Sequence, residues 1–184
     1  MMNEMLKIIE SRFSCRGYTD KKLTSDEVNA IANAAVQSPS ANNSQRWQII
    51  MVTNKELIQE MDDEALKVMS GFEDKSMYER MMSRGGSVFY NASCVAYIAT
   101  SSADVALDCG IVSENIALAA TALGLGNCIC GLAGLSFSED KGAYFKEKLG
   151  FQKDFGFGMA VLIGHAKEPG KPHDPDTSKI TIID

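Results

Sequence analysis

The sequence predicts one domain, residues 1–184, built from helices and strands around a helix buried at its centre. Three observations predict this class. Apolar residues recur at helical spacing in several segments, and short apolar runs of strand length lie between them. Residues 103–123 are apolar on nearly every face, which is typical of a helix inside a structure. A chain of 184 residues suits one sizeable core better than two independent domains.

Three helices and one strand are expected in the first half of the chain. Residues 2–13 begin with an apolar stripe at helical spacing, and an arginine-rich loop follows it. The stretch from Thr24 to Glu27 is a capping box, so a second helix begins there and ends before Pro39. Residues 47–53 then form a buried strand, and the last of the three helices carries apolar residues from position 57 to 69. No element is predicted for 71–87.

The second half of the chain is also expected to contain both strands and helices. Further extended segments are expected at 93–100, 127–132 and 157–163. The buried helix ends at the glycines at 124–126, and Ser138 is expected to cap another helix that closes at Gly150. The tail from Gly164 holds three of the four prolines, so we expect it to run over the surface or to reach for a partner.

Composition narrows the classes of partner and compartment. The net charge of −6, with no basic patch, opposes binding to nucleic acid. Five widely spread cysteines do not resemble a disulfide framework, so free thiols and a reducing, cytoplasmic location are expected. No run of apolar residues is long enough for a membrane helix, and the first residues lack the pattern of a signal peptide. These features predict a soluble protein that is not exported.

Two polar segments are candidate binding motifs. The stretch Arg12-x-Ser14-x-Arg16 offers two guanidinium groups and a hydroxyl, which suit a phosphate, although a solvated turn is the alternative. The amide-rich run from Pro39 to Gln45 offers donors and acceptors together, as the edge of a flavin requires. A polar turn closed by side-chain bonds explains that run equally well.

Glycines and cysteines at 124–131 form the third candidate. The spacing does not fit a dinucleotide-binding fingerprint, and the stretch follows a helix where that fingerprint follows a strand. The glycines let the backbone approach a flat ring, or they simply cap the helix. Cys128 and Cys130 fit buried inert thiols better than metal ligands, and no nucleophile, base and acid triad is recognisable. No metal and no catalytic side chain are therefore predicted.

Taken together and in order, these segments resemble the nitroreductase family. The resemblance lies in Arg12-x-Ser14-x-Arg16, in Pro39-Ser40-x-x-Asn43-x-Gln45-x-Trp47, and in Asp108-x-Gly110 continuing through Asn115 to Gly126. The sequence from Val161 to His165 resembles the last strand of the family. The resemblance implies an α+β fold, with a mainly antiparallel sheet flanked by helices and a long buried central helix. It also implies a homodimer with one FMN at each of two subunit interfaces.

The resemblance also implies roles for single residues. Arg12, Ser14 and Arg16 would hold the phosphate and ribityl side of FMN, and Lys171 would match a basic phosphate ligand. The other subunit would supply Ser40, Ala41, Asn42 and Asn43, with Gln45 beside them. The backbone of Cys128, Ile129, Cys130 and Gly131 would lie against the flavin ring. A cation such as Arg16 would stabilise the reduced flavin.

The implied activity is an FMN-dependent oxidoreductase. NADH or NADPH would deliver hydride, and a nitroaromatic, a quinone or a similar acceptor would then be reduced at the same face. The alternatives are a dehydrogenase or oxidase of a dedicated metabolite and a flavin-binding redox sensor with negligible turnover. Arg46 replaces a usual proline and Ile129 a frequent tryptophan, so the pocket beside the cofactor differs from that of typical members. Residues 71–87, with Arg84, line its opening or form a surface loop.

Overall fold

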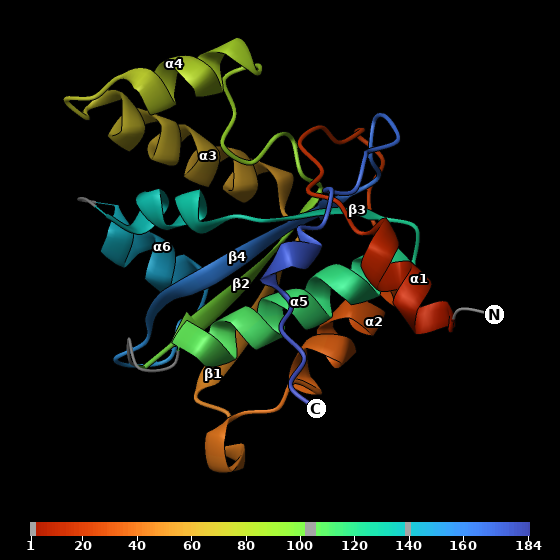
Figure 1. The fold of residues 1–184 in the computed structure, drawn as a ribbon. Coiled ribbons are helices and arrows are strands. Elements are labelled where there is room, and N and C mark those ends of the chain that lie inside the picture. The colour runs from red at the N-terminus through yellow and green to blue at the C-terminus, as the bar shows by residue number, and fades with distance from the viewer. Residues whose placement is uncertain (1–2, 102–105, 139–140) are drawn as a thin grey trace.

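The computed structural model describes residues 3–101, 106–138 and 141–184. Four strands form one antiparallel sheet in the order β1-β2-β4-β3. The strands are β1 (Trp47–Val52), β2 (Cys94–Thr100), β3 (Gly126–Ile129) and β4 (Gly156–Gly164). Because β2 lies inside the sheet and is covered on both faces, all seven of its residues are buried. The α+β class with an antiparallel sheet is thereby confirmed (Figure 1).

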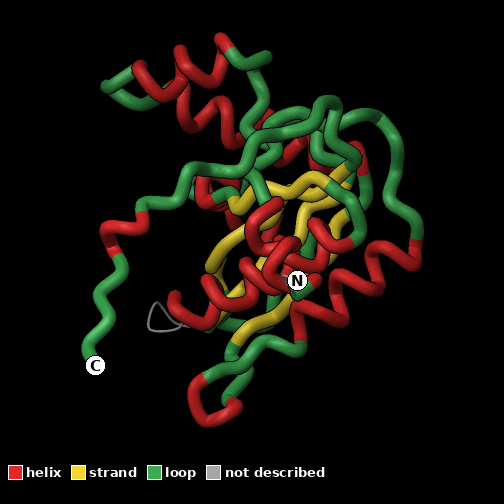
Figure 2. Tube along the Cα trace, turned by 45° about the vertical axis from the view of Figure 1, so that its right-hand side comes forward, coloured by secondary structure: helices red, strands yellow, loops and turns green. Residues whose placement is uncertain are grey.

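Helices cover both faces of this sheet (Figure 2). The helices are α1 (Glu4–Ser11), α2 (Ser25–Val36), α3 (Lys55–Ser70), α4 (Ser76–Ser83), α5 (Ala106–Ala122) and α6 (Gly142–Lys148), with short 3-10 turns η1 (Ala41–Asn43), η3 (Gly131–Phe137) and η4 (Thr177–Lys179). One core cluster joins the sheet to α3, η3 and α6, and a second joins it to α2 and α5. No helix in the described ranges is long and apolar enough to cross a membrane.

The local signals for α2 and α5 place their ends correctly. Thr24 Oγ1 accepts from the N–H of Glu27, whose carboxylate accepts from the N–H of Thr24 at 2.7 Å. At the other helix, Gly124 has a left-handed φ of 73°, and its N–H and that of Leu125 bond back to the last turn. Gly124 is therefore a helix cap, the alternative to a ring contact. The predicted start of α5 at 103 lies outside the described residues.

Two sequence interpretations need correction. Ser138 does not cap the next helix but ends η3, and α6 begins after Lys141 without a side-chain cap. The segment at 127–132 is extended only as far as Cys130, because Gly131 already begins η3. In the unassigned segment 71–87 the structure has α4, which packs on α3. The tail after Gly164 has no α-helix and leaves the body of the molecule, as expected (Figure 2).

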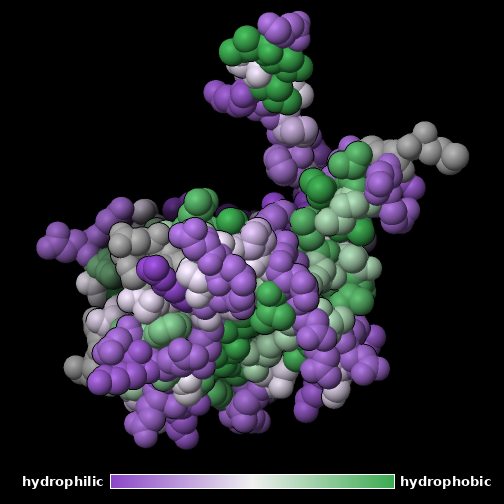
Figure 3. Space-filling view, turned by 90° about the horizontal axis from the view of Figure 1, so that it is seen from below, coloured by the Kyte–Doolittle hydropathy of each residue, from purple (hydrophilic) through white to green (hydrophobic). Residues whose placement is uncertain are grey.

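Helices α1 and α5 leave apolar side chains uncovered. Met5, Leu6 and Ile9, the stripe that predicted α1, are 51%, 51% and 48% exposed. On α5 one side is buried against the sheet, whereas Leu107 on another side is 77% exposed. The tail adds Ile182 and Ile183, which are among the most exposed apolar residues. Figure 3 shows apolar surface both on the body and on a projecting piece of chain.

Candidate functional site

The arginine-rich loop packs directly on the edge strand β3. The N–H of Cys15 donates to the carbonyl of Asn127 at 2.7 Å, and Ser14 forms a bridge with the same residue. Gly126 makes this approach possible, because a Cβ there would lie 2.8 Å from the sulfur of Cys15. The second glycine of the 124–131 stretch thus serves contact between two chain segments rather than contact with a ring.

Tyr18 fixes the far end of the loop. Its hydroxyl is buried and lies 3.1 Å from the carbonyl oxygen of Cys15 and 3.3 Å from that of Leu162. Burial, the largest cause, raises the pKa of Tyr18 well above its usual value, so the group stays a neutral donor. Tyr18 also bridges to Ala166, and the N–H of Lys167 donates to the carbonyl of Gly17 at 3.0 Å. These bonds bring the start of the tail beside the loop.

The loop and the tail enclose a hollow of about 400 Å³. Residues 13–17 and 167–171 line it, and they bring together Ser14, Arg16 and Lys171. Lys167 adds a cation and Glu168 an anion, and neither was singled out from the sequence. The charge of the pair Lys167-Glu168 cancels locally, which is why the pattern carried no signal. A cationic hollow that also holds a hydroxyl suits a phosphate or another small anion.

Arg12 lies apart from this hollow. Its guanidinium Nε is 3.8 Å from a carboxylate oxygen of Glu114 on α5, and its side chain is 20% exposed. The Arg12 side chain therefore ties the start of the loop to α5 in the single chain. Of the four cofactor residues expected in the loop and tail, three line one hollow and Arg12 does not.

The second half of β3 offers an open backbone edge. The N–H of Cys130 donates to the carbonyl of Ala160 in β4 at 2.8 Å. Since successive residues of a strand point their N–H groups to opposite sides, the N–H of Ile129 faces away from β4. Ile129 is 36% exposed, whereas Cys128 and Cys130 are buried on one face, as alternation predicted. Ile129 therefore presents both backbone and side chain at the edge, next to Gly131.

The thiols of this strand are not reactive groups. Burial raises the pKa of Cys128, and it raises that of Cys130 to about 11. All five cysteines are free and buried. In the described part of the chain, no three His, Cys, Asp or Glu side chains are grouped to hold a metal ion.

The amide-rich loop lies elsewhere in the single chain. It precedes β1, and β1 and β3 are opposite edges of the sheet, roughly 14 Å apart across the intervening strands. Trp47 also lies level with Gly156, and Gly126 with Gly164, at the other end of β4, roughly 25 Å along the sheet. One chain therefore does not bring this loop to the hollow (Figure 1).

Residues 41–46 are exposed, and the bonds within the loop hold its shape. Ser40 Oγ accepts from the N–H of Gln45 at 2.9 Å, and the Gln45 amide donates to Asn43 Oδ1 at 2.8 Å. Asn42, Asn43 and Gln45 have left-handed φ values of 53°, 52° and 46°. Such backbone is strained for residues other than glycine and is common at binding sites. The polar-turn interpretation describes these bonds, and the exposed amides of the loop remain accessible.

The fold and the hollow define an α+β protein with a cationic site beside an open strand edge. The chain belongs to the nitroreductase family, because the sequence model of that family matches residues 9–165. A crystal structure of a nitroreductase with bound FMN from Desulfitobacterium hafniense DCB-2 is 45% identical and covers all of both chains, with a TM-score of 0.97. A second, also with bound FMN, from Bacteroides fragilis is 25% identical over both whole chains, with a TM-score of 0.90.

A curated relative agrees with this assignment. The "Putative NADH dehydrogenase/NAD(P)H nitroreductase" of Archaeoglobus fulgidus is 28% identical over 95% of this chain and 92% of its own length.

Proposed function

We propose that the chain is an FMN-dependent oxidoreductase that accepts hydride from NADH or NADPH. The observation that carries this proposal is the placement of Ser14, Arg16 and Lys171 around one hollow that adjoins the open edge at Ile129. The cations suit a phosphate, and an outward N–H suits an acceptor nitrogen of a ring. The FMN bound in two similar structures supports the same ligand.

The residues of the chain would bind and orient, and FMN when bound would supply the hydride chemistry. Lys171 and Arg16 would neutralise its phosphate, and Ser14 would donate or accept beside them. The N–H of Ile129 would donate to an acceptor nitrogen of the ring, and burial, which raises the pKa of Cys128 and Cys130, disfavours their nucleophilic thiolate forms. Arg12 would join the phosphate by leaving Glu114, a pair that at 3.8 Å is weak. Nitroaromatics and quinones are the acceptors we propose.

The proposed assembly is a homodimer in the cytoplasm that shares each site between two copies. The uncovered stripe on α1, the exposed side of α5 and the apolar tail supply surface for such a partner. A twofold axis would carry the loop 40–45 of one copy to the hollow of the other. Ser40, Ala41, Asn42, Asn43 and Gln45 would then reach the ring edge with their donors and acceptors.

The first experiment tests cofactor and donor together. The purified protein is mixed with FMN, desalted, and titrated anaerobically with NADH and then NADPH while its absorption spectrum is recorded. Retained flavin bands that bleach with either nucleotide are expected. Retained flavin that stays oxidised would favour the dedicated dehydrogenase or the sensor, and loss of all flavin would refute the cofactor.

Matched variants locate the site. Arg16→Ala and Lys171→Ala should each weaken FMN binding by roughly ten- to a hundredfold, because each charge-assisted bond contributes roughly 1.5–3 kcal/mol. Lys179→Ala is the control, since Lys179 and Lys171 are both 81% exposed and each pairs with an aspartate three residues away. Equal FMN binding by Lys171→Ala and Lys179→Ala would remove Lys171 from the site.

Complementation tests the sharing of sites. Arg16→Ala and Asn43→Ala should each weaken both sites of a homodimer. A mixed dimer of the two variants would place both substitutions in one site and leave the other intact, so half of the FMN should bind with normal affinity. If each site lay within one chain, every site of the mixed dimer would stay defective.

A further inference from the structure

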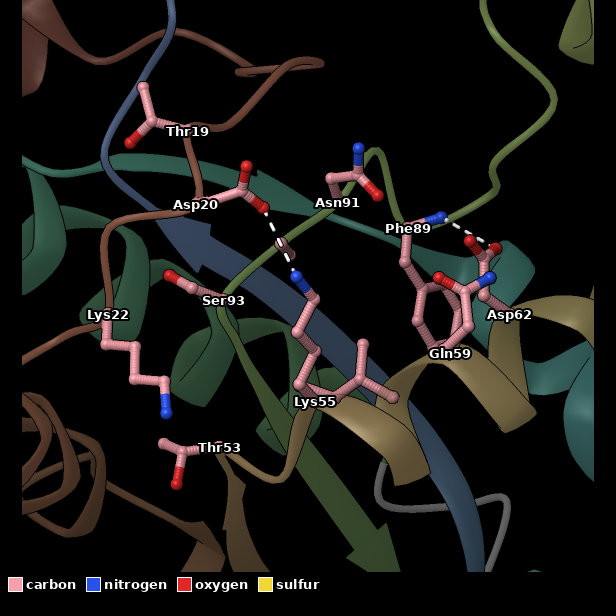
Figure 4. Close-up of a pocket in the computed structure, with 12 residues that line it drawn as sticks. Thr19, Asp20, Lys22, Thr53, Lys55, Gln59, Asp62, Phe89, Asn91 and Ser93 are labelled. Carbon is pink, nitrogen blue, oxygen red and sulfur yellow. Dashed lines mark hydrogen bonds and ion pairs between the residues drawn. The ribbon is translucent and has the colours of Figure 1, made fainter.

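A second hollow, of about 100 Å³, lies on the α3 side of the sheet (Figure 4). It is bounded by the segment that follows Tyr18, by the first half of α3, and by the residues that precede β2. None of its lining residues lines the cationic hollow at 13–17 and 167–171. The two cavities are therefore separate features of the chain.

The inner wall of this hollow is apolar. Ile58, Phe89 and Ala92 line it, and they are 5%, 1% and 6% exposed. An apolar cavity of roughly 150 Å³ can hold a benzene molecule, so this smaller hollow of about 100 Å³ has room for a short branched chain rather than a ring. A compact apolar body would gain burial against these three side chains.

The mouth of the hollow carries cations. Lys55 Nζ lies 3.3 Å from Asp20 Oδ1, in a pair whose side chains are 74% and 90% exposed. A pair so exposed contributes little, so an incoming anion can replace Asp20 beside Lys55. Lys22 also lines the hollow, and in Figure 4 Lys55 points toward Asp20 while the side chain of Lys22 runs toward Thr53.

Two polar side chains of this hollow, those of Ser93 and Asn91, could bond to a ligand. The hydroxyl oxygen of Ser93 is buried and has no hydrogen-bond partner, a state that favours a bound polar group. Asn91 holds its amide at the rim from a left-handed backbone with a φ of 62°. The buried carboxylate of Asp62, at the far end, is already occupied by three donors, from Ser87, Val88 and Phe89.

We propose that this hollow binds a small monocarboxylate with a compact apolar body. The carboxylate lies at the mouth between Lys22 and Lys55, where Asn91 can donate to it. The apolar body enters between Ile58 and Phe89. Neutral ligands of the same shape lose the two charge interactions, and cationic ligands meet the like charges of Lys22 and Lys55 against the single negative charge of Asp20.

Isobutyrate is the probe, and the full-length protein saturated with FMN is titrated with it at low salt. Amide chemical shifts in NMR spectra report the place of binding. The largest changes are expected at Lys55, Asn91 and Ser93, with an unchanged flavin absorption spectrum. Isobutyramide, which has the same shape without the charge, should bind at least fivefold more weakly.

Variants separate recognition from general charge. Lys22→Gln and Lys55→Gln should each weaken isobutyrate binding up to about fivefold, the effect of one exposed ion pair. Lys179→Gln is the control, because Lys179 is also exposed and also paired with an aspartate. Ala92→Leu should abolish binding by filling the hollow, and its circular dichroism spectrum checks that the variant folds.

Several results would overturn the proposal. Equal affinity for isobutyrate and isobutyramide would refute recognition of the carboxylate. Shift changes centred on Ile129 and Gly131, with a changed flavin spectrum, would place isobutyrate at the cofactor site instead. An absence of shift changes at millimolar isobutyrate would show that the hollow binds no such ligand, and it would leave the FMN proposal unaffected.

Discussion

Asp62 anchors the turn that leads from α4 into β2, and its removal gives the sharpest stability prediction. Its side chain is 5% exposed. One carboxylate oxygen accepts from the N–H groups of Val88 and Phe89 at 2.7 and 3.0 Å, and the other from Ser87 Oγ at 2.6 Å. Asp62→Ala leaves two buried N–H groups without an acceptor, at about 1–3 kcal/mol each. The substitution also removes the cost of burying a carboxylate, which offsets part of this loss. We therefore expect the free energy of unfolding to fall by about 3 kcal/mol.

Urea unfolding followed by circular dichroism, at one fixed protein concentration, measures this loss. Asp62→Asn keeps an acceptor for both N–H groups, and its amide can donate to Ser87, so it should cost less than about 1 kcal/mol. Asp63→Ala is the control, because Asp63 is exposed and its carboxylate accepts from the exposed amide of Gln59. The reasoning is refuted if Asp62→Ala is no less stable than Asp63→Ala, or if Asp62→Asn is as unstable as Asp62→Ala.

Three further predictions concern stability. Burial raises the pKa of Asp62, so the stability that its bound proton provides is present in acid and lost as pH rises through the raised pKa. The melting temperature of Asp62→Asn should therefore rise relative to that of the wild type as pH increases from 4 to 7. A difference in melting temperature that stays constant over this range would contradict the prediction. Gly126→Ala should cost about 1–3 kcal/mol in urea unfolding, because its Cβ would lie 2.8 Å from the sulfur of Cys15, and adding Cys15→Ala should recover part of the loss. Thr24→Ala should cost about 1 kcal/mol and Thr24→Ser much less, and equal losses would exclude the capping bond.

Local signals predicted most of the elements. The capping box at Thr24, the strand-length apolar runs and the glycine at 124 each act within a few residues, so the sequence contains their cause. Serine is a common residue at helix starts, but Ser138 does not cap the next helix, because it ends the 3-10 turn η3 instead. Helix α4 was missed although Met77, Tyr78, Met81 and Met82 recur at helical spacing, because the helix has only eight residues and glycines lie on either side of it.

The candidate site was predictable in part for a different reason. Arginines near a hydroxyl suggest a phosphate wherever they occur, but only the fold brings Lys171 to Arg16 from the other end of the chain. Periodicity correctly predicted helix α1, but it did not predict what covers the apolar stripe. In the single chain Met5, Leu6 and Ile9 are 51%, 51% and 48% exposed. The contact between Gly126 and Cys15 could not be predicted, because neither local sequence indicates that the two segments meet.

The open half of β3 has a consequence for handling the protein. Residues 14 and 15 cover the strand only at Asn127, and beyond it the backbone at Ile129 faces outward with an exposed isoleucine beside it. A bare strand edge is a template for another chain, which can add to the sheet and begin aggregation. A ligand bound along this edge prevents another strand from pairing with it. Preparations stripped of their ligand should accordingly turn turbid sooner on storage than loaded ones.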